Sequence, residues 1–127
     1  MAIKVNPIVL VGIPTLREDA PLSWQWHDAI RSLQFPLGTS VAWSRITGKI
    51  VAEARNILCQ QALAMQANYL LFISDDVIPP ARIFEMLHRH RTELVTGVYW
   101  TKETNPKPYL WQGQMQGPHE DWVFGEY

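Results

Sequence analysis

The stretch Tyr69–Pro80 (YLLFISDDVIPP) constrains the fold most, because a continuous apolar run ends there in two adjacent carboxylates and a proline pair. An apolar run rich in Leu, Ile, Phe and Tyr is typical of a strand that is buried on both faces of a parallel sheet. Pro80 suits the first position of a helix, and apolar residues recur after it at helical spacing. The stretch therefore predicts a strand, an acidic turn at Asp75 and Asp76, and a helix.

Strands and helices alternate along the chain up to about residue 99. Apolar runs predict three further strands, at residues 8–13, 39–44 and 94–99. Apolar stripes predict two further helices, one capped by Asp19 or Ala20 and one capped by Thr47 or Gly48. This alternation predicts an α/β fold, a Rossmann-like, mostly parallel sheet flanked by helices with right-handed crossovers. Residues 101–127 are rich in aromatic residues, Gly, Pro and Gln and predict an irregular segment with a short strand near residues 109–112.

Composition limits the class of protein. A chain of 127 residues with 47% hydrophobic residues predicts one domain with a real core. The net charge of −1 and the lack of a basic run argue against nucleic-acid binding. The single cysteine, Cys59, excludes an intrachain disulfide and is expected to be a small buried side chain. No apolar segment is long enough for a transmembrane helix, so the expected location is the cytoplasm.

The paired carboxylates of Asp75 and Asp76 are the first candidate site. In an open α/β sheet, ligands bind outside the carboxyl ends of the strands, which is where this pair is predicted to lie. Two adjacent carboxylates repel each other where water is scarce, and a divalent cation relieves that repulsion. The alternative is that the pair places negative charge at the N-terminus of the following helix. The sequence leaves both interpretations open.

Arg55 and Asn56 are the second candidate site. They flank the apolar stripe of the helix that precedes Tyr69, so they are expected to be partly buried beside the sheet. An arginine offers a planar fork to phosphate oxygens, and an asparagine offers a donor and an acceptor to a sugar or base. The alternative is that Arg55 bonds a loop carbonyl or Asp75.

Four segments in this order resemble the nucleotide-binding half of a GT-A fold, family 2-type glycosyltransferase. They are Ile13–Thr15, Ala54–Asn56, Tyr69–Pro80 and Val95–Tyr99. The resemblance runs from about Ile8 to Trp111. It implies a single GT-A-like domain that binds a nucleotide-diphosphate sugar donor across the carboxyl ends of the strands.

The resemblance also implies roles for individual residues. Pro14, Thr15 and Arg17 would line the nucleoside pocket, and Arg55 and Asn56 would face the nucleotide.

The family's Asp-x-Asp signature falls on Ser74, Asp75 and Asp76. Asp76 then inherits the binding of a manganese or magnesium ion. Ser74 departs from the pattern, since it stands where the family has an aspartate. Its hydroxyl can still bond a ribose, and Asp75 can supply the missing charge.

The acceptor half is not evident in the sequence. The resemblance does not identify the acceptor, which can be a glycan, a protein or a small molecule. Glu120 and Asp121 are similar to the family's acidic acceptor-side motif but follow Asp76 too closely, so a solvated turn is the favoured interpretation. The chain is shorter than a complete catalytic domain of this family, which implies a fragment or a minimal homologue that completes its site in an oligomer.

Two other functions stay open. A catalytically silent nucleotide-sugar-binding module is consistent with Ser74 and with the lack of an assigned catalytic base. A receiver-type phosphoacceptor domain also gathers aspartates around magnesium at strand ends. It is disfavoured because the first predicted strand ends in Gly12-Ile13-Pro14 without an acidic pair.

Overall fold

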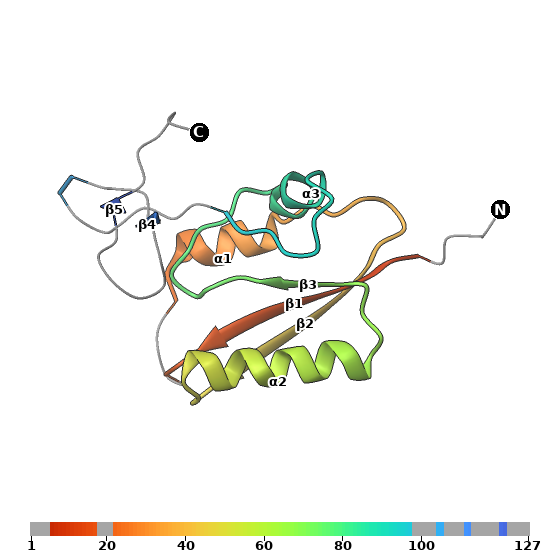
Figure 1. Cartoon of the computed structure of the whole chain (residues 1–127), viewed down its shortest axis with the longest axis horizontal. Coiled ribbons are helices and arrows are strands. Elements are labelled where there is room, and N and C mark those ends of the chain that lie inside the picture. Colours follow the sequence, from red (N-terminus) through yellow and green to blue (C-terminus); the bar gives the residue numbers. More distant parts are fainter. Residues whose placement is uncertain (1–5, 18–21, 98–103, 106–110, 113–119, 122–127) are drawn as a thin grey trace. The chain divides into compact units, whose positions relative to one another are not determined.

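The computed structural model describes residues 6–17, 22–97, 104–105, 111–112 and 120–121. The chain forms two compact units, Met1–Arg89 and His90–Tyr127, and each is described by itself. The first unit contains β1 (Ile8–Thr15), α1 (Trp24–Arg31), β2 (Ser40–Thr47), α2 (Val51–Ala64), β3 (Tyr69–Phe72) and α3 (Ile83–His88) (Figure 1). The second unit contains β4 (Trp111–Gln112) and β5 (Glu120–Asp121), which pair antiparallel.

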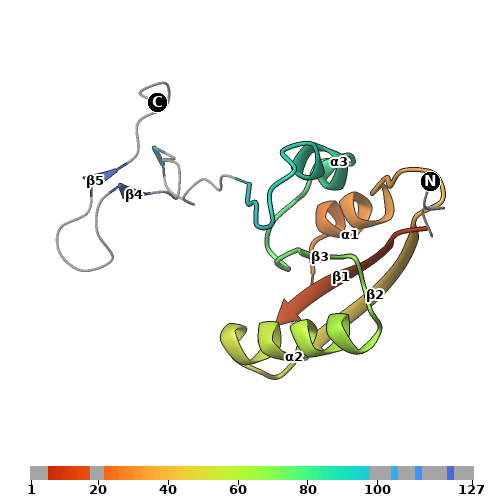
Figure 2. The ribbon, with the colours of Figure 1, turned by 45° about the vertical axis from the view of Figure 1, so that its right-hand side comes forward.

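The first unit is a small α/β fold built on a three-stranded parallel sheet in the order β2-β1-β3. Helix α2 covers one face of the sheet, and α1 and α3 lie on the other face (Figures 1 and 2). The predicted parallel sheet flanked by helices is therefore confirmed at this coarse level.

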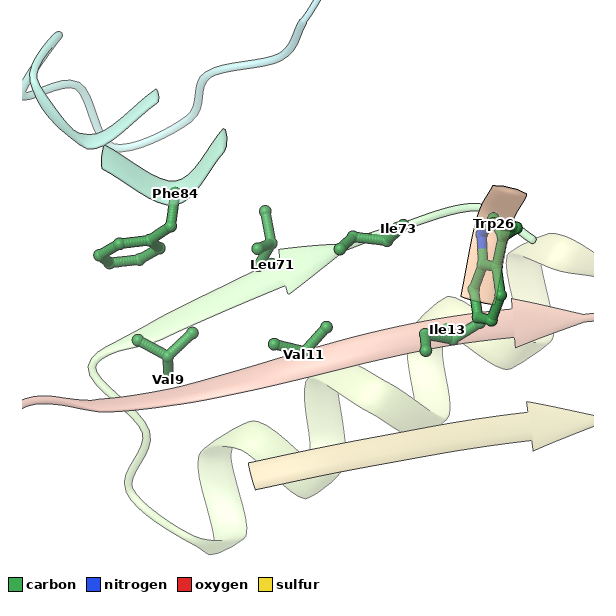
Figure 3. Packing of buried hydrophobic residues seen from close by; sticks show 7 residues of the cluster. All are labelled: Val9, Val11, Ile13, Trp26, Leu71, Ile73 and Phe84. Atoms are coloured by element: carbon green, nitrogen blue, oxygen red, sulfur yellow. The ribbon is translucent and has the colours of Figure 1, made fainter. Parts of the chain in front are cut away.

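The main core lies between the sheet and the helices α1 and α3. Alternate residues of a strand point to opposite faces. The register pairs odd-numbered residues of β1 with odd-numbered residues of β3, so these side chains share one face. Figure 3 shows these side chains pointing toward Trp26 of α1 and Phe84 of α3. The members of this cluster are Val9, Val11, Ile13, Trp26, Leu71, Ile73 and Phe84.

The opposite face packs on α2 at close range. Ala54 and Leu58, which lie one helical turn apart on α2, are fully buried. A Cβ atom on Gly12 would lie 2.9 Å from the Leu58 Cδ1 atom, so only glycine lets the helix approach β1 this closely. Because α2 follows β2 and runs back along the sheet, its N-terminus lies at the carboxyl edge of the strands.

The predicted strand at residues 94–99 is wrong for its described part. Residues 94–97 belong to no strand, and Leu94 is 92% exposed. Residues 98 and 99 lie outside the described part of the chain. An apolar run predicts a strand only if a sheet edge is there to bury it.

The predicted helix caps are also wrong. Helix α1 is capped by Ser23, whose hydroxyl accepts a hydrogen bond from the Trp26 amide. Helix α2 is preceded by Ile50, and Gly48 instead forms a turn with a positive φ of 73°. The predicted cap residues Asp19 and Ala20 lie outside the described residues.

Two burial predictions are wrong. β3 is half-buried rather than buried on both faces, since it has a neighbour on only one side in the described sheet. Cys59 is exposed, because it follows Leu58 on α2 and is turned away from the sheet.

The second unit confirms a short strand within the predicted range 109–112, at Trp111–Gln112. Tyr109 lies outside the described residues. Glu120 and Asp121 form β5, so the favoured interpretation as a turn is wrong. Every helix in the described part of the chain is too short or too polar to span a lipid bilayer.

Candidate functional site

The connections of the sheet define where a ligand crevice can form. The chain passes from β1 to β2 through α1 on one face, and from β2 back to β3 through α2 on the other face. The carboxyl ends of the neighbouring strands β1 and β2 are therefore continued by connections that leave on opposite faces of the sheet. A ligand crevice is expected beyond the strand ends at such a switch point, and β3 lies on the other side of β1.

Pro14 ends the pairing of β1 with β3 at this point. The Gly12 carbonyl accepts a hydrogen bond from the Ile73 amide at 3.0 Å, so the even-numbered residues of β1 present their backbone groups to β3. Pro14 is the next such residue, and it has no amide hydrogen to donate. β3 leaves the sheet here, whereas β1 continues to pair with β2 up to Thr15.

The two carboxylates occupy the corner of a turn that follows β3. The Val77 amide donates to the Ser74 carbonyl at 3.4 Å, and Asp75 and Asp76 are the central residues between them. The Trp26 Nε1–H also donates to the Ser74 carbonyl, at 3.0 Å. Since Trp26 is 4% exposed, the turn is anchored to a buried side chain of α1.

The turn is separate from the helix that follows it. Helix α3 begins at Ile83 and is preceded by Arg82, and the acidic residue of its first turn is Glu85. The helix dipole acts within the first turn, and Asp75 and Asp76 lie outside that turn. The interpretation of the pair as helix-capping charge is wrong.

The turn that carries the acids starts close to the last contact between β3 and β1. Gly12 pairs with Phe72, and the Ile73 amide donates to the Gly12 carbonyl just before the turn begins at Ser74. Asp75 is half-buried and Asp76 is exposed. Pro14 and Thr15 are both buried, whereas Arg17 is exposed in the loop after β1.

Arg55 lies close to the last residue of β3. Its Cζ atom is 5.6 Å from the centroid of the Phe72 ring, a cation–π contact, and its side chain is exposed rather than partly buried as predicted. It pairs with no carboxylate among the described residues. The predicted alternative of a bond to Asp75 is therefore not what the structure shows.

The structure separates Asn56 from this group. Asn56 lies two positions after Ala54 and two before Leu58, which turns it about 160–200° away from the buried side of α2. Its side chain is exposed instead of partly buried. Successive residues of a helix do not share one face, so only Arg55 of the predicted pair lies near the end of β3.

The carboxylates on this turn suit a metal ion whose other ligands come from water and from the bound substrate. No group of three or more His, Cys, Asp and Glu side chains is gathered for a metal ion in the described ranges. Magnesium is usually held by one or two protein carboxylates together with water and substrate phosphates. The adjacent acids Asp75 and Asp76 on an anchored turn fit that arrangement.

Two surface depressions lie away from the predicted site residues. One of about 230 Å³ is lined by Arg82, Glu85, Met86 and Arg89. The other, of about 420 Å³, is lined by Leu22, Trp24, His27 and Arg31. Arg82 pairs with Glu85, and Arg31 with Asp28, and neither depression is lined by a residue that was predicted for the site. We therefore assign the site to the strand ends.

Two residues that bond to Ser74 and Thr15 are missing from the sequence-based prediction of the site. For Trp26, the available signal was its indole N–H, which requires a partner when it is buried. Arg45 lies on β2, and its Nε–H donates to the Thr15 Oγ1 atom at 3.2 Å. Arg45 follows directly after the strand predicted at residues 39–44, and an arginine at the end of a strand was the available signal for it.

Comparisons of the chain with protein-family models, with curated proteins and with solved structures found no match. The function of this chain is therefore inferred from the geometry and chemistry of the site.

Proposed function

We propose that this chain is a metal-dependent glycosyltransferase of the GT-A type, or its donor-binding half, which uses a nucleotide-diphosphate sugar. The observation that carries the proposal is the position of Asp75 and Asp76 on an anchored turn that follows β3 at the carboxyl edge of the sheet, next to β1. The exposed guanidinium of Arg55 beside Phe72 supports it. Pro14, Thr15 and Arg17 would border the nucleoside, and Ser74 the ribose.

The chemistry requires positive charge at the donor's diphosphate. Transfer breaks the bond between the anomeric carbon and a phosphate oxygen, which leaves negative charge on the diphosphate. A manganese or magnesium ion held by Asp75 and Asp76 would supply Lewis-acid stabilisation of that charge. Arg55 would donate hydrogen bonds to the phosphate oxygens.

Calorimetry with Mn²⁺ and a panel of nucleotide sugars tests this proposal. We expect binding that requires the metal and that is lost in the double variant Asp75→Asn/Asp76→Asn. Asp28→Asn is the matched control, since it removes an exposed carboxylate whose ion pair with Arg31 contributes little. Failure of every donor to bind the unaltered chain would contradict the proposal.

A catalytically silent binding module is the second candidate function. It is favoured by Ser74, which places a neutral residue where the family has an acid, and by the lack of an assigned base. Incubation of the chain with Mn²⁺ and a donor that binds separates the two functions. Release of the nucleoside diphosphate indicates an enzyme, and binding without hydrolysis or transfer indicates a module.

The receiver-type alternative has its own test. The order β2-β1-β3 also occurs in flavodoxin-like domains, so strand order does not distinguish the two classes. A receiver domain takes the phosphoryl group of a small phosphodonor onto an aspartate carboxylate, which releases the donor's leaving group and forms an aspartyl phosphate. Incubation with a small phosphodonor followed by mass spectrometry should show no phosphorylated aspartate, and stable labelling would favour the receiver class.

A further inference from the structure

We propose that Arg45 reads the base of the nucleotide and selects a base edge with two adjacent hydrogen-bond acceptors, as guanine and cytosine present. This inference rests on the proposed function and adds the identity of the base. It assigns a specificity-determining role to a residue of β2 that the resemblance does not mark.

The side chain of Arg45 is held in place by one bond. Its Nε–H donates to the Thr15 Oγ1 atom at 3.2 Å. Thr15 is 1% exposed, so this oxygen is fixed within the end of β1. The bond leaves the terminal Nη groups of the exposed guanidinium available. Among the described residues, no carboxylate pairs with Arg45.

The location of Arg45 matches the nucleoside end of the ligand. The order β2-β1-β3 separates the strand of Arg45 from the strand that leads to the acids by two strand spacings, roughly 10 Å. If the diphosphate lies at Asp75, Asp76 and Arg55, the nucleoside extends from there across the end of β1. The base then comes within reach of Arg45, beside the buried hydroxyl of Thr15.

The chemistry of a guanidinium decides which bases fit. Arginine only donates hydrogen bonds, and its fork matches two adjacent acceptors, as in its paired contact with O6 and N7 of guanine. Cytosine also presents two adjacent acceptors, O2 and N3. Uracil places an N–H donor between its two carbonyl groups, and adenine places an amino group beside N7. Uracil and adenine therefore offer the fork only one acceptor.

Calorimetry with the full chain, Mn²⁺ and the diphosphates of guanosine, cytidine, uridine and adenosine tests the proposal. We expect the guanosine or the cytidine diphosphate to bind about 5- to 150-fold more tightly than the other two, as one paired contact gives. Arg45→Gln and Arg45→Lys should both remove this preference, because neither side chain has the fork. Arg31→Gln removes a positive charge from the last turn of α1 and should keep it.

The outcomes separate the two proposals. Metal-dependent binding without a base preference, or a preference that survives in both Arg45 variants, would overturn the role of Arg45 and leave the proposed function intact. Failure of all four nucleotides and of the sugar donors to bind would overturn both. A uniform loss of affinity in Arg45→Gln, with the ranking of bases unchanged, would show that Arg45 only attracts the phosphates.

Discussion

Gly12 controls how closely α2 packs on the sheet. A methyl group at this position would lie 2.9 Å from the Leu58 Cδ1 atom and 3.1 Å from its Cδ2 atom. Leu58 is fully buried and has little room to move. We expect Gly12→Ala to lower the free energy of unfolding by about 1–3 kcal/mol, the usual effect of overpacking. Urea denaturation followed by circular dichroism measures this change.

The double variant Gly12→Ala/Leu58→Ala is the control for this packing argument. Leu58→Ala alone should cost about 2–5 kcal/mol, since it removes a buried side chain. If the two residues are in direct conflict in Gly12→Ala, the double variant should lose less stability than the sum of the single variants. Additive losses would contradict the proposed contact.

After the two acids, Arg55 has the most direct role in the proposed function. We expect Arg55→Gln to weaken nucleoside-diphosphate binding by about 10- to 150-fold, because a charged hydrogen bond to phosphate contributes about 1.5–3 kcal/mol. Its contact with the Phe72 ring is exposed, so folding stability should change little. Gln60→Ala, an exposed change on the same helix, is the matched control for calorimetry. Equal affinity in both variants would remove Arg55 from the site.

At the scale of single elements, the turn after β3 depends on α1. The Trp26 Nε1–H donates to the Ser74 carbonyl at 3.0 Å and so holds the acidic turn against the first helix. We expect Trp26→Phe, which keeps an aromatic ring but lacks the donor, to destabilise the fold by at least about 0.5–1.5 kcal/mol. It should also weaken Mn²⁺ binding in the presence of nucleotide, measured by calorimetry. Unchanged metal affinity in the folded variant would show that the bond does not position the acids.

The elements themselves were largely predictable from the sequence. Continuous apolar runs located β1 and β3, and the spacing of Ala54 and Leu58 located α2. The ends of the helices were not predictable, because several residues near Ser23 are also able to cap α1. Residues 94–97 form no strand, and an apolar run does not reveal whether a sheet edge is available to pair with it.

At the scale of the whole first unit, the sequence predicted that the acids end a strand, but it did not predict what surrounds them. The crevice depends on the order of the strands, which places β1 between β2 and β3. That order is set by long-range packing and brings Thr15 and Arg45 together across residues far apart in sequence. Asn56 was assigned to the site because helical neighbours were treated as one motif, although they face different directions.

We propose that Asp75, Asp76 and the end of β1 border one crevice that holds the nucleotide. Paramagnetic broadening by Mn²⁺, recorded on amide NMR signals with a saturating nucleoside diphosphate, tests it most directly. We predict selective broadening at Thr15, Asp75, Asp76 and Val77, with the signals of the distant Arg31 and Leu37 retained. Broadening confined to any other part of the chain, or none while the nucleotide is bound, would contradict the account.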